Sequence, residues 1–189
     1  MSEGLYADFL TSYLQTADEE LFGYALFDGV KHPSLYKELQ KSSLEYDTLF
    51  IETDLRSQLK EVAPYMIKLD FNKKRSTQES KQLLEHCKKE EALLFTSSLG
   101  FKKQLEKMQN IFHITDEEDK IESYLRFYDS QIFDALTKAQ DAVFLTHLFQ
   151  DSSSYWLQDE SSQTKVTQYD YKDSLVSTKS IDLVQNKGK

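Results

Sequence analysis

The sequence predicts an α/β fold of the α+β kind, with a mixed central sheet flanked by helices and followed by a small helical C-terminal lobe. The chain has 189 residues, 39% of them hydrophobic, and its 12 Phe and 11 Tyr supply large apolar side chains for a core. It has only five Gly and two Pro, too few for the many tight turns of an all-β fold. Short apolar runs alternate with segments of helical periodicity, as expected for helices packed on a sheet.

Helices are predicted where apolar residues recur every three or four positions. Leu5, Phe9 and Tyr13 define the first helix, and Pro33 suits the first turn of the second. Ser76 or Thr77 is a suitable cap for the third helix. The four helices expected before residue 111 cover residues 5–14, 33–41, 77–89 and 100–110.

Strands are predicted at short apolar or β-branched runs. Residues 21–27 form a nearly continuous apolar run that ends at Asp28-Gly29, which is typical of a buried strand. Pro64 stands first in its strand, where the missing N–H costs little. The basic residues 71–78 are expected to form a solvated loop. The six predicted strands cover residues 21–27, 46–52, 64–70, 92–96, 111–114 and 122–128.

The pattern changes after Asp129. Apolar residues at helical spacing predict two helices between residues 130 and 149, with no strand between them. Beyond residue 151 the chain is rich in Ser, Thr, Gln, Asp and Lys, which favours weak folding. We therefore expect an α/β lobe at residues 1–129, a helical lobe at 130–157 and a polar, partly disordered tail at 158–189.

The charge balance excludes two classes of partner. With 23 basic and 32 acidic residues the formal net charge is −9, which repels nucleic-acid phosphates and anionic membrane surfaces. The single cysteine, Cys87, cannot form an internal disulfide, and no stretch approaches the roughly 20 apolar residues of a membrane span. Met1-Ser2-Glu3-Gly4 has no signal-peptide pattern, so a cytoplasmic location is expected.

No motif for catalysis or metal binding occurs in the sequence. The chain has no P-loop, nucleophile elbow, dinucleotide fingerprint, HExxH or paired CxxC, and its four histidines are widely spaced. We therefore expect no catalytic residues, no metal, no cofactor and no enzyme. One alternative is a small hydrolase that uses Asp28 and His32, four positions apart beyond a strand end, although a turn role for Asp28 is the simpler interpretation.

Five sequence blocks occur in the order and spacing of one protein family. They are residues 24–28, 33–36, 63–69, 94–99 and 125–129, and the most specific is the last, Leu-Arg-Phe-Tyr-Asp. Over about residues 21–150 the chain resembles the Tap-like adaptor chaperones of bacterial type VI secretion, once catalogued as a domain of unknown function. The family usually continues the last block with Pro-Arg, whereas this chain has Ser130-Gln131. The residues that match the family motifs, with a structural or partner-binding role, are Asp28, Pro64, Arg126, Phe127, Tyr128 and Asp129.

The residues of the last block also indicate local structure. In an extended segment Tyr124, Arg126 and Tyr128 share one face. Arg126 is then placed to form an ion pair with Asp28 or Asp129, and we favour this structural role over direct partner contact. Asp129 is expected to cap the next helix.

The resemblance implies an adaptor that binds a specific type VI effector in the cytosol and loads it onto the VgrG spike protein. In the family, effector choice is thought to lie largely in the C-terminal part. We therefore select Phe133, Phe144, Tyr155 and Trp156 as candidate effector-binding residues, although helical spacing of Phe133 and Phe144 also suits a core. An immunity protein that neutralises a toxin is the alternative binder.

Overall fold

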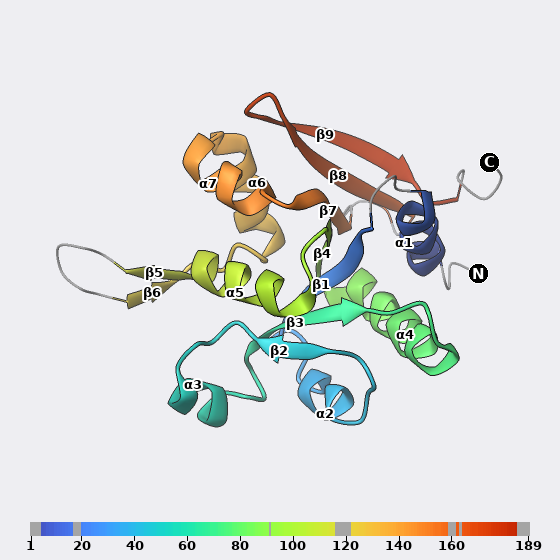
Figure 1. The fold of residues 1–189 in the computed structure, drawn as a ribbon, viewed down its shortest axis with the longest axis vertical. Coiled ribbons are helices and arrows are strands. Elements are labelled where there is room, and N and C mark those ends of the chain that lie inside the picture. Colours follow the sequence, from blue (N-terminus) through green and yellow to red (C-terminus); the bar gives the residue numbers. More distant parts are fainter. Residues whose placement is uncertain are drawn as a thin grey trace.

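The computed structural model confirms the α/β class and describes residues 5–16, 20–90, 92–115, 122–158, 162 and 164–184. Helices and strands follow one another from the N-terminus, and a two-stranded hairpin stands apart from the main sheet (Figure 1). The helices are α1 (Leu5–Thr16), α2 (Leu35–Leu39), α3 (Thr53–Gln58), α4 (Lys74–Glu90), α5 (Phe101–Phe112), α6 (Ser130–Ala139) and α7 (Ala142–Phe149). The strands are β1 (Phe22–Asp28), β2 (Tyr46–Thr48), β3 (Pro64–Leu69), β4 (Leu93–Ser97), β5 (His113–Thr115), β6 (Glu122–Tyr124), β7 (Ser152–Gln158), β8 (Lys165–Lys172) and β9 (Leu175–Asp182).

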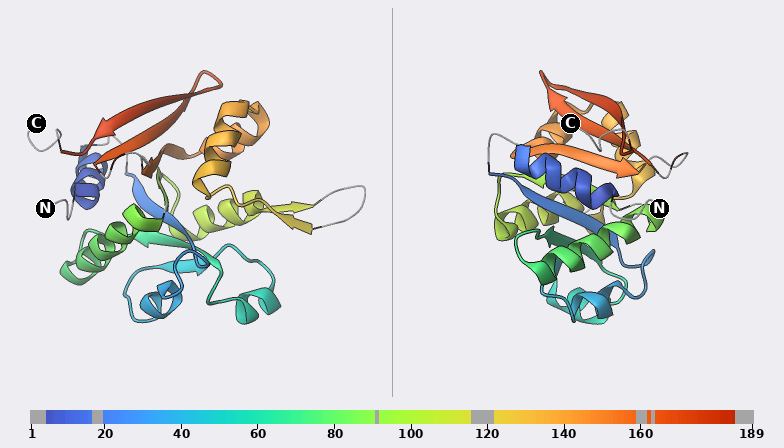
Figure 2. Two further views of the ribbon diagram at one scale, coloured as in Figure 1. Left: turned by 180° about the vertical axis from the view of Figure 1, so that it is seen from behind. Right: turned by 90° about the vertical axis from the view of Figure 1, so that its right-hand side faces the viewer.

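Seven strands form the main sheet in the order β2-β3-β1-β4-β7-β8-β9, and β5 pairs with β6. Every pairing is antiparallel, so the predicted mixed sheet is wrong in strand direction. The central strands β1 and β4 are almost entirely buried, because helices cover both faces of the sheet. Helices α1 and α4 lie on one face and α6 and α7 on the other (Figure 2).

A ladder of aromatic rings forms the centre of the core. Tyr24, Phe95 and Tyr155 stack across β1, β4 and β7, with 5.2 Å between successive ring centroids. Phe133 of α6 packs on Tyr155 at 5.4 Å and meets Tyr169 of β8 edge-on at 5.1 Å. The aromatic residues therefore join the C-terminal strands to the middle of the sheet.

The C-terminal third differs most from the prediction. The prediction places residues 152–157 in a helical lobe and residues 158–189 in a polar, partly disordered tail, but β7, β8 and β9 extend the main sheet. Only Val166 and Tyr169 are buried in β8, so buried and exposed residues do not alternate clearly along this strand. A boundary between folding units at residue 130 stays a prediction.

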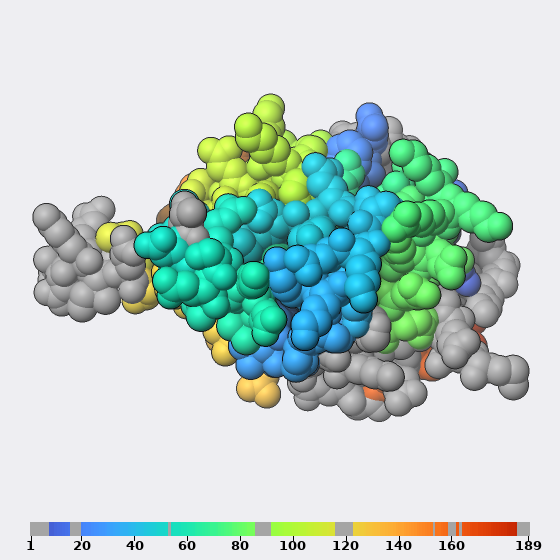
Figure 3. Space-filling view, turned by 90° about the horizontal axis from the view of Figure 1, so that it is seen from below, coloured from blue at the N-terminus to red at the C-terminus, as the bar shows by residue number. Residues whose placement is uncertain are grey.

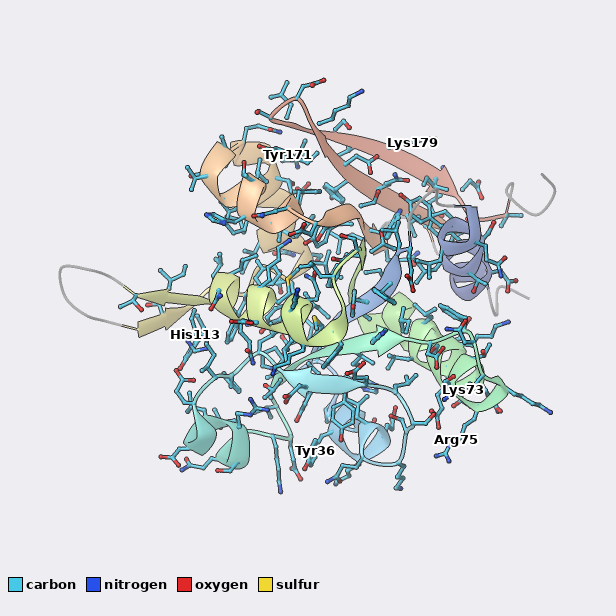
Figure 4. All side chains as sticks on the ribbon, in the orientation of Figure 1. Tyr36, Lys73, Arg75, His113, Tyr171 and Lys179 are labelled. Atoms are coloured by element: carbon cyan, nitrogen blue, oxygen red, sulfur yellow. The ribbon has the colours of Figure 1, made fainter. Side chains whose placement is uncertain are left out.

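Two other predicted segments end or begin elsewhere. Helix α4 starts at Lys74, within the loop predicted for residues 71–78, and the ion pair between Arg75 and Glu79 at 2.9 Å supports its first turns. Figure 4 labels Lys73 and Arg75 at this end of the helix. The strand predicted for residues 122–128 stops at Tyr124, where the pairing with β5 ends.

The surface seen from below in Figure 3 is formed largely by α2, α3 and α4, with α5 along one edge. Helix α5 runs directly into β5 at the base of the β5–β6 hairpin, and α7 lies against α5 (Figure 1). Residues of β5, together with residues of α5 and α7, line the groove described below.

Candidate functional site

The residues that match the family motifs meet at one end of the sheet. Asp28 closes β1, Pro64 opens β3, and the two are partners in the antiparallel register. The segment after β6 brings Arg126 to the same place, where its guanidinium forms an ion pair with the Asp28 carboxylate. The predicted ion pair is thus confirmed, although the extended strand predicted for this segment is not.

Burial makes this ion pair asymmetric. The Asp28 side chain is 7% exposed and the Arg126 side chain is 47% exposed. The Arg126 guanidinium also lies 6.0 Å from the ring centroid of Tyr128, whose pKa is raised to about 12 by burial and by the Asp28 charge. Phe127 lies between Arg126 and Tyr128 in the chain and is fully buried. The segment is therefore held in place by the buried Phe127 ring and by the ion pair of Arg126 with Asp28.

A second ion pair continues the cluster. Lys31 Nζ lies 3.2 Å from Asp129 Oδ2, and the other Asp129 oxygen accepts hydrogen bonds from the Gln131 and Ile132 N–H groups. The predicted N-cap of α6 is therefore confirmed. Partial burial opposes ionisation of Asp129, but Lys31 and these N–H groups outweigh it and hold its pKa below the ordinary value.

Gly29 allows the close approach of two turns at the same site. Its N–H donates to the Ala63 carbonyl at 3.1 Å, and a Cβ at this position would lie 2.4 Å from that carbonyl oxygen. Only glycine fits without a backbone shift. We name the group formed by Asp28, Lys31, Arg126 and Asp129 the charged cluster; it ties the end of β1 to the start of α6.

Replacing the central arginine tests whether the charged cluster is structural. Arg126→Ala is expected to lower the free energy of unfolding by about 1–2 kcal/mol, because it leaves the buried Asp28 carboxylate without its cation while solvent screens the outer side. Urea denaturation at pH 7 measures this loss. Lys138→Ala, which removes an exposed i,i+4 pair with Asp134, is the matched control and should change little. If Arg126→Ala kept its stability but no longer bound a partner, Arg126 would be a partner-contact residue and not a structural one.

A groove opens beside the charged cluster, between α5, β5 and α7. Its volume is about 760 Å³, and the segment that carries Arg126 contributes Leu125 to its wall. Val143 of α7 is 72% exposed and Ile114 of β5 is 45% exposed, so apolar side chains face solvent from two walls. The apolar lining residues are Leu99, Ile111, Ile114, Leu125, Val143 and Phe144.

A lysine lies at the end of this groove. Lys107 of α5 donates to the carbonyl of Gln150, the C-cap of α7, and lies 3.4 Å from Ser152 Oγ. Burial lowers the pKa of its ammonium to about 8, and the nearby Asp151 charge opposes this shift. The hydrogen bond from Lys107 to the Gln150 carbonyl at the end of α7 joins α5 to α7.

Three of the four candidate effector-binding residues are in the core. Phe133, Tyr155 and Trp156 are at most 1% exposed, so the prediction that they form a binding surface is wrong. Phe144 lines the groove and is half-buried. The sequence analysis did not select Ile114, Val143 or Leu125 for binding. Val143 is an apolar residue of α7 outside the buried positions Leu145, Leu148 and Phe149, and this is the signal that could have indicated it.

The hydrolase alternative predicts a pocket where Asp28 and His32 converge with another titratable group. Neither residue lines the groove or either of two further cavities, one between α1 and β3 and one between α2 and α4. Asp28 instead accepts a hydrogen bond from the Val30 N–H at 3.0 Å and forms the ion pair with Arg126.

Within the described part of the chain no three His, Cys, Asp or Glu side chains are grouped to hold a metal. None of the described helices combines the length and the apolarity that a membrane crossing requires.

Comparison with known proteins gives one match. A family model described as "Domain of unknown function (DUF4123)" matches residues 23–143. This range contains the charged cluster and most of the residues that line the groove. No curated protein and no solved structure matches the chain.

Proposed function

Because the chain belongs to the DUF4123 family, which is associated with adaptors of type VI secretion, we propose that it is an adaptor that binds one effector in the cytosol and loads it onto the VgrG spike protein. The observation that carries the proposal is the groove with exposed apolar side chains on two walls, most of whose lining residues lie in the family-matched range. A groove with exposed apolar walls suits the burial of an apolar segment of a protein partner better than the chemistry of a small substrate.

The charged cluster supports this function indirectly. It fixes the segment that places Leu125 in the groove wall, and the Leu125 N–H is held by the Phe112 carbonyl at 2.8 Å. Arg126 is therefore a positioning residue, and the apolar side chains of the groove make the proposed contacts. A preformed wall lowers the ordering cost of binding.

Charged substitutions in the groove are expected to abolish effector loading. Val143→Asp combined with Ile114→Asp places two carboxylates on opposite walls, and binding of the effector should weaken about a hundredfold. The adaptor proposal expects a large reading frame for the effector beside the gene of this chain. The measurement is co-purification of the tagged chain with the protein that this reading frame encodes, followed by secretion of that protein from cells carrying each variant. Both sites are exposed, so the melting temperature should stay close to that of the unmodified chain.

Val62→Asp is the matched control, because Val62 is an exposed apolar residue outside the groove, 43% exposed. The adaptor proposal expects normal binding and secretion with this variant. Equal binding by the groove variant and the control would remove the groove from the proposal. Protection of a target cell by the chain, with effector secretion unaffected by its deletion, would show an immunity protein instead.

A further inference from the structure

Strand β9 is the last strand of the main sheet and has an open edge. It pairs with β8 without interruption from Lys165–Asp182 to Lys172–Leu175, and no described strand pairs with its other side. Figures 1 and 2 show no helix or strand along this outer edge, and Figure 4 labels Lys179 near its middle. The opposite end of the sheet is β2, which has only three residues.

The hydrogen-bonding direction of β9 follows from two observed bonds. The Leu183 N–H donates to the Thr164 carbonyl at 2.7 Å, toward the β8 side. The Val176 N–H donates to the side chain of Gln140 at 3.1 Å, on the outer side. Successive residues of an antiparallel strand alternate in direction, so odd-numbered residues bond to β8. Thr178 and Ser180 therefore direct both N–H and C=O outward.

Few features protect this edge against pairing. Residues 175–182 contain no proline and no glycine, and the register with β8 shows no bulge. The side chains at the centre are Ser177, Thr178 and Ser180, which are short and exposed. Lys179 is the one charged residue between positions 175 and 181. A lysine on an edge strand repels a strand that carries a cation and accepts one that carries a carboxylate.

We propose that the outer edge of β9 pairs with an extended segment of the effector that carries an Asp or Glu opposite Lys179. The inference rests on the proposed function, because the effector is the partner named there. Main-chain hydrogen bonds from Thr178 and Ser180 hold the added strand, and Lys179 selects its charge. A second copy of the chain fits less well, since the symmetric pairing centred on Lys179 sets two ammonium groups against each other.

Proline at the outward positions tests this edge without breaking the sheet. Thr178→Pro combined with Ser180→Pro removes two outward N–H donors, and the ladder with β8 does not use them. Binding of the protein encoded by the neighbouring large reading frame should weaken about tenfold or more. The matched control, Thr178→Ala combined with Ser180→Ala, keeps both N–H groups and should bind normally. Amide exchange in the wild-type complex should show new protection at residues 178 and 180.

Two substitutions of Lys179, one that reverses its charge and one that keeps it, give a second, independent readout if the proline variant fails to fold. Lys179→Glu should weaken binding and Lys179→Arg should preserve it. If the wild-type chain binds the effector and the proline and glutamate variants bind it equally tightly, the β9 proposal is overturned and the adaptor function stands. A wild-type chain that does not bind the effector would overturn both. A dimer of the free chain that the proline variant abolishes would identify a second copy as the occupant and overturn the effector assignment.

Discussion

The protein is expected to unfold cooperatively between about pH 11 and 12, because its buried tyrosines must ionise. Burial raises the pKa of each of five tyrosines above its ordinary value of 10.0, to about 12 for Tyr128 and Tyr169. Three of them also donate hydrogen bonds to main-chain carbonyls at 2.7 Å, which a phenolate cannot do. The five are Tyr24, Tyr65, Tyr128, Tyr155 and Tyr169.

The direction of the pH effect follows from the native and unfolded pKa values. A tyrosine whose pKa is higher in the native state keeps its proton longer when folded, so its stabilisation is complete below pH 10 and is lost as the pH rises above it. Each costs about 1.4 kcal/mol per pH unit in that range. Lys107 acts in the opposite sense, because its native pKa is lowered to about 8; it adds about 2–3 kcal/mol between pH 8 and 10.5. Stability should therefore rise by about 2–3 kcal/mol between pH 8 and 10 and then fall steeply.

Two spectra taken together measure this transition. Absorbance at a phenolate wavelength and far-ultraviolet circular dichroism should change at the same pH for the buried group of tyrosines. Tyr155→Phe is the control: it loses the hydrogen bond to the Leu148 carbonyl and should be less stable at pH 7, but its stability should fall less steeply above pH 10. Ionisation of all eleven tyrosines near pH 10 before any loss of structure would contradict the prediction.

The central part of the fold could be predicted because its local signals agree with the tertiary environment. Strands β1 and β3 are apolar runs between turn residues, and Asp129 precedes an apolar helical pattern. Strands β7, β8 and β9 could not be predicted in the same way. Their stabilisation comes from buried side chains whose partners lie elsewhere in the sequence, such as Tyr169, which meets Phe133 of α6.

The site shows the same division between local and long-range information. The ion pair of Arg126 with Asp28 joins residues 98 positions apart, and the family resemblance supplied the reason to look for it. The groove has no sequence motif, because it is made where β5, α5 and α7 meet. Aromatic content misled the choice of binding residues, since large aromatic side chains are enriched both in cores and at interfaces.

Trp156→Ala is expected to destabilise the protein by about 3–5 kcal/mol without acting on a binding surface. The indole of Trp156 is 1% exposed and meets two rings of α1, Tyr13 at 4.9 Å and Phe9 at 6.0 Å. Tyr13 also forms a hydrogen bond with Ser154 of β7 at 3.1 Å. The substitution therefore leaves a cavity between the first helix and the C-terminal strands, both of which lie outside the family-matched range.

Urea denaturation of Trp156→Ala and Trp156→Phe measures this effect and separates packing from binding. The phenylalanine variant keeps one ring against Tyr13 and Phe9, so it should recover much of the loss. Leu175→Ala, at an exposed position of β9, should change the free energy of unfolding by less than about 0.5 kcal/mol. If the alanine variant kept its stability but lost the effector, Trp156 would have to leave the core to make contact. Whether Trp156 packs in the core or binds a partner decides the role of the C-terminal strands. If the buried indole anchors α1 to the sheet, these strands are part of the folded core, and their open edge is the part that can meet a partner.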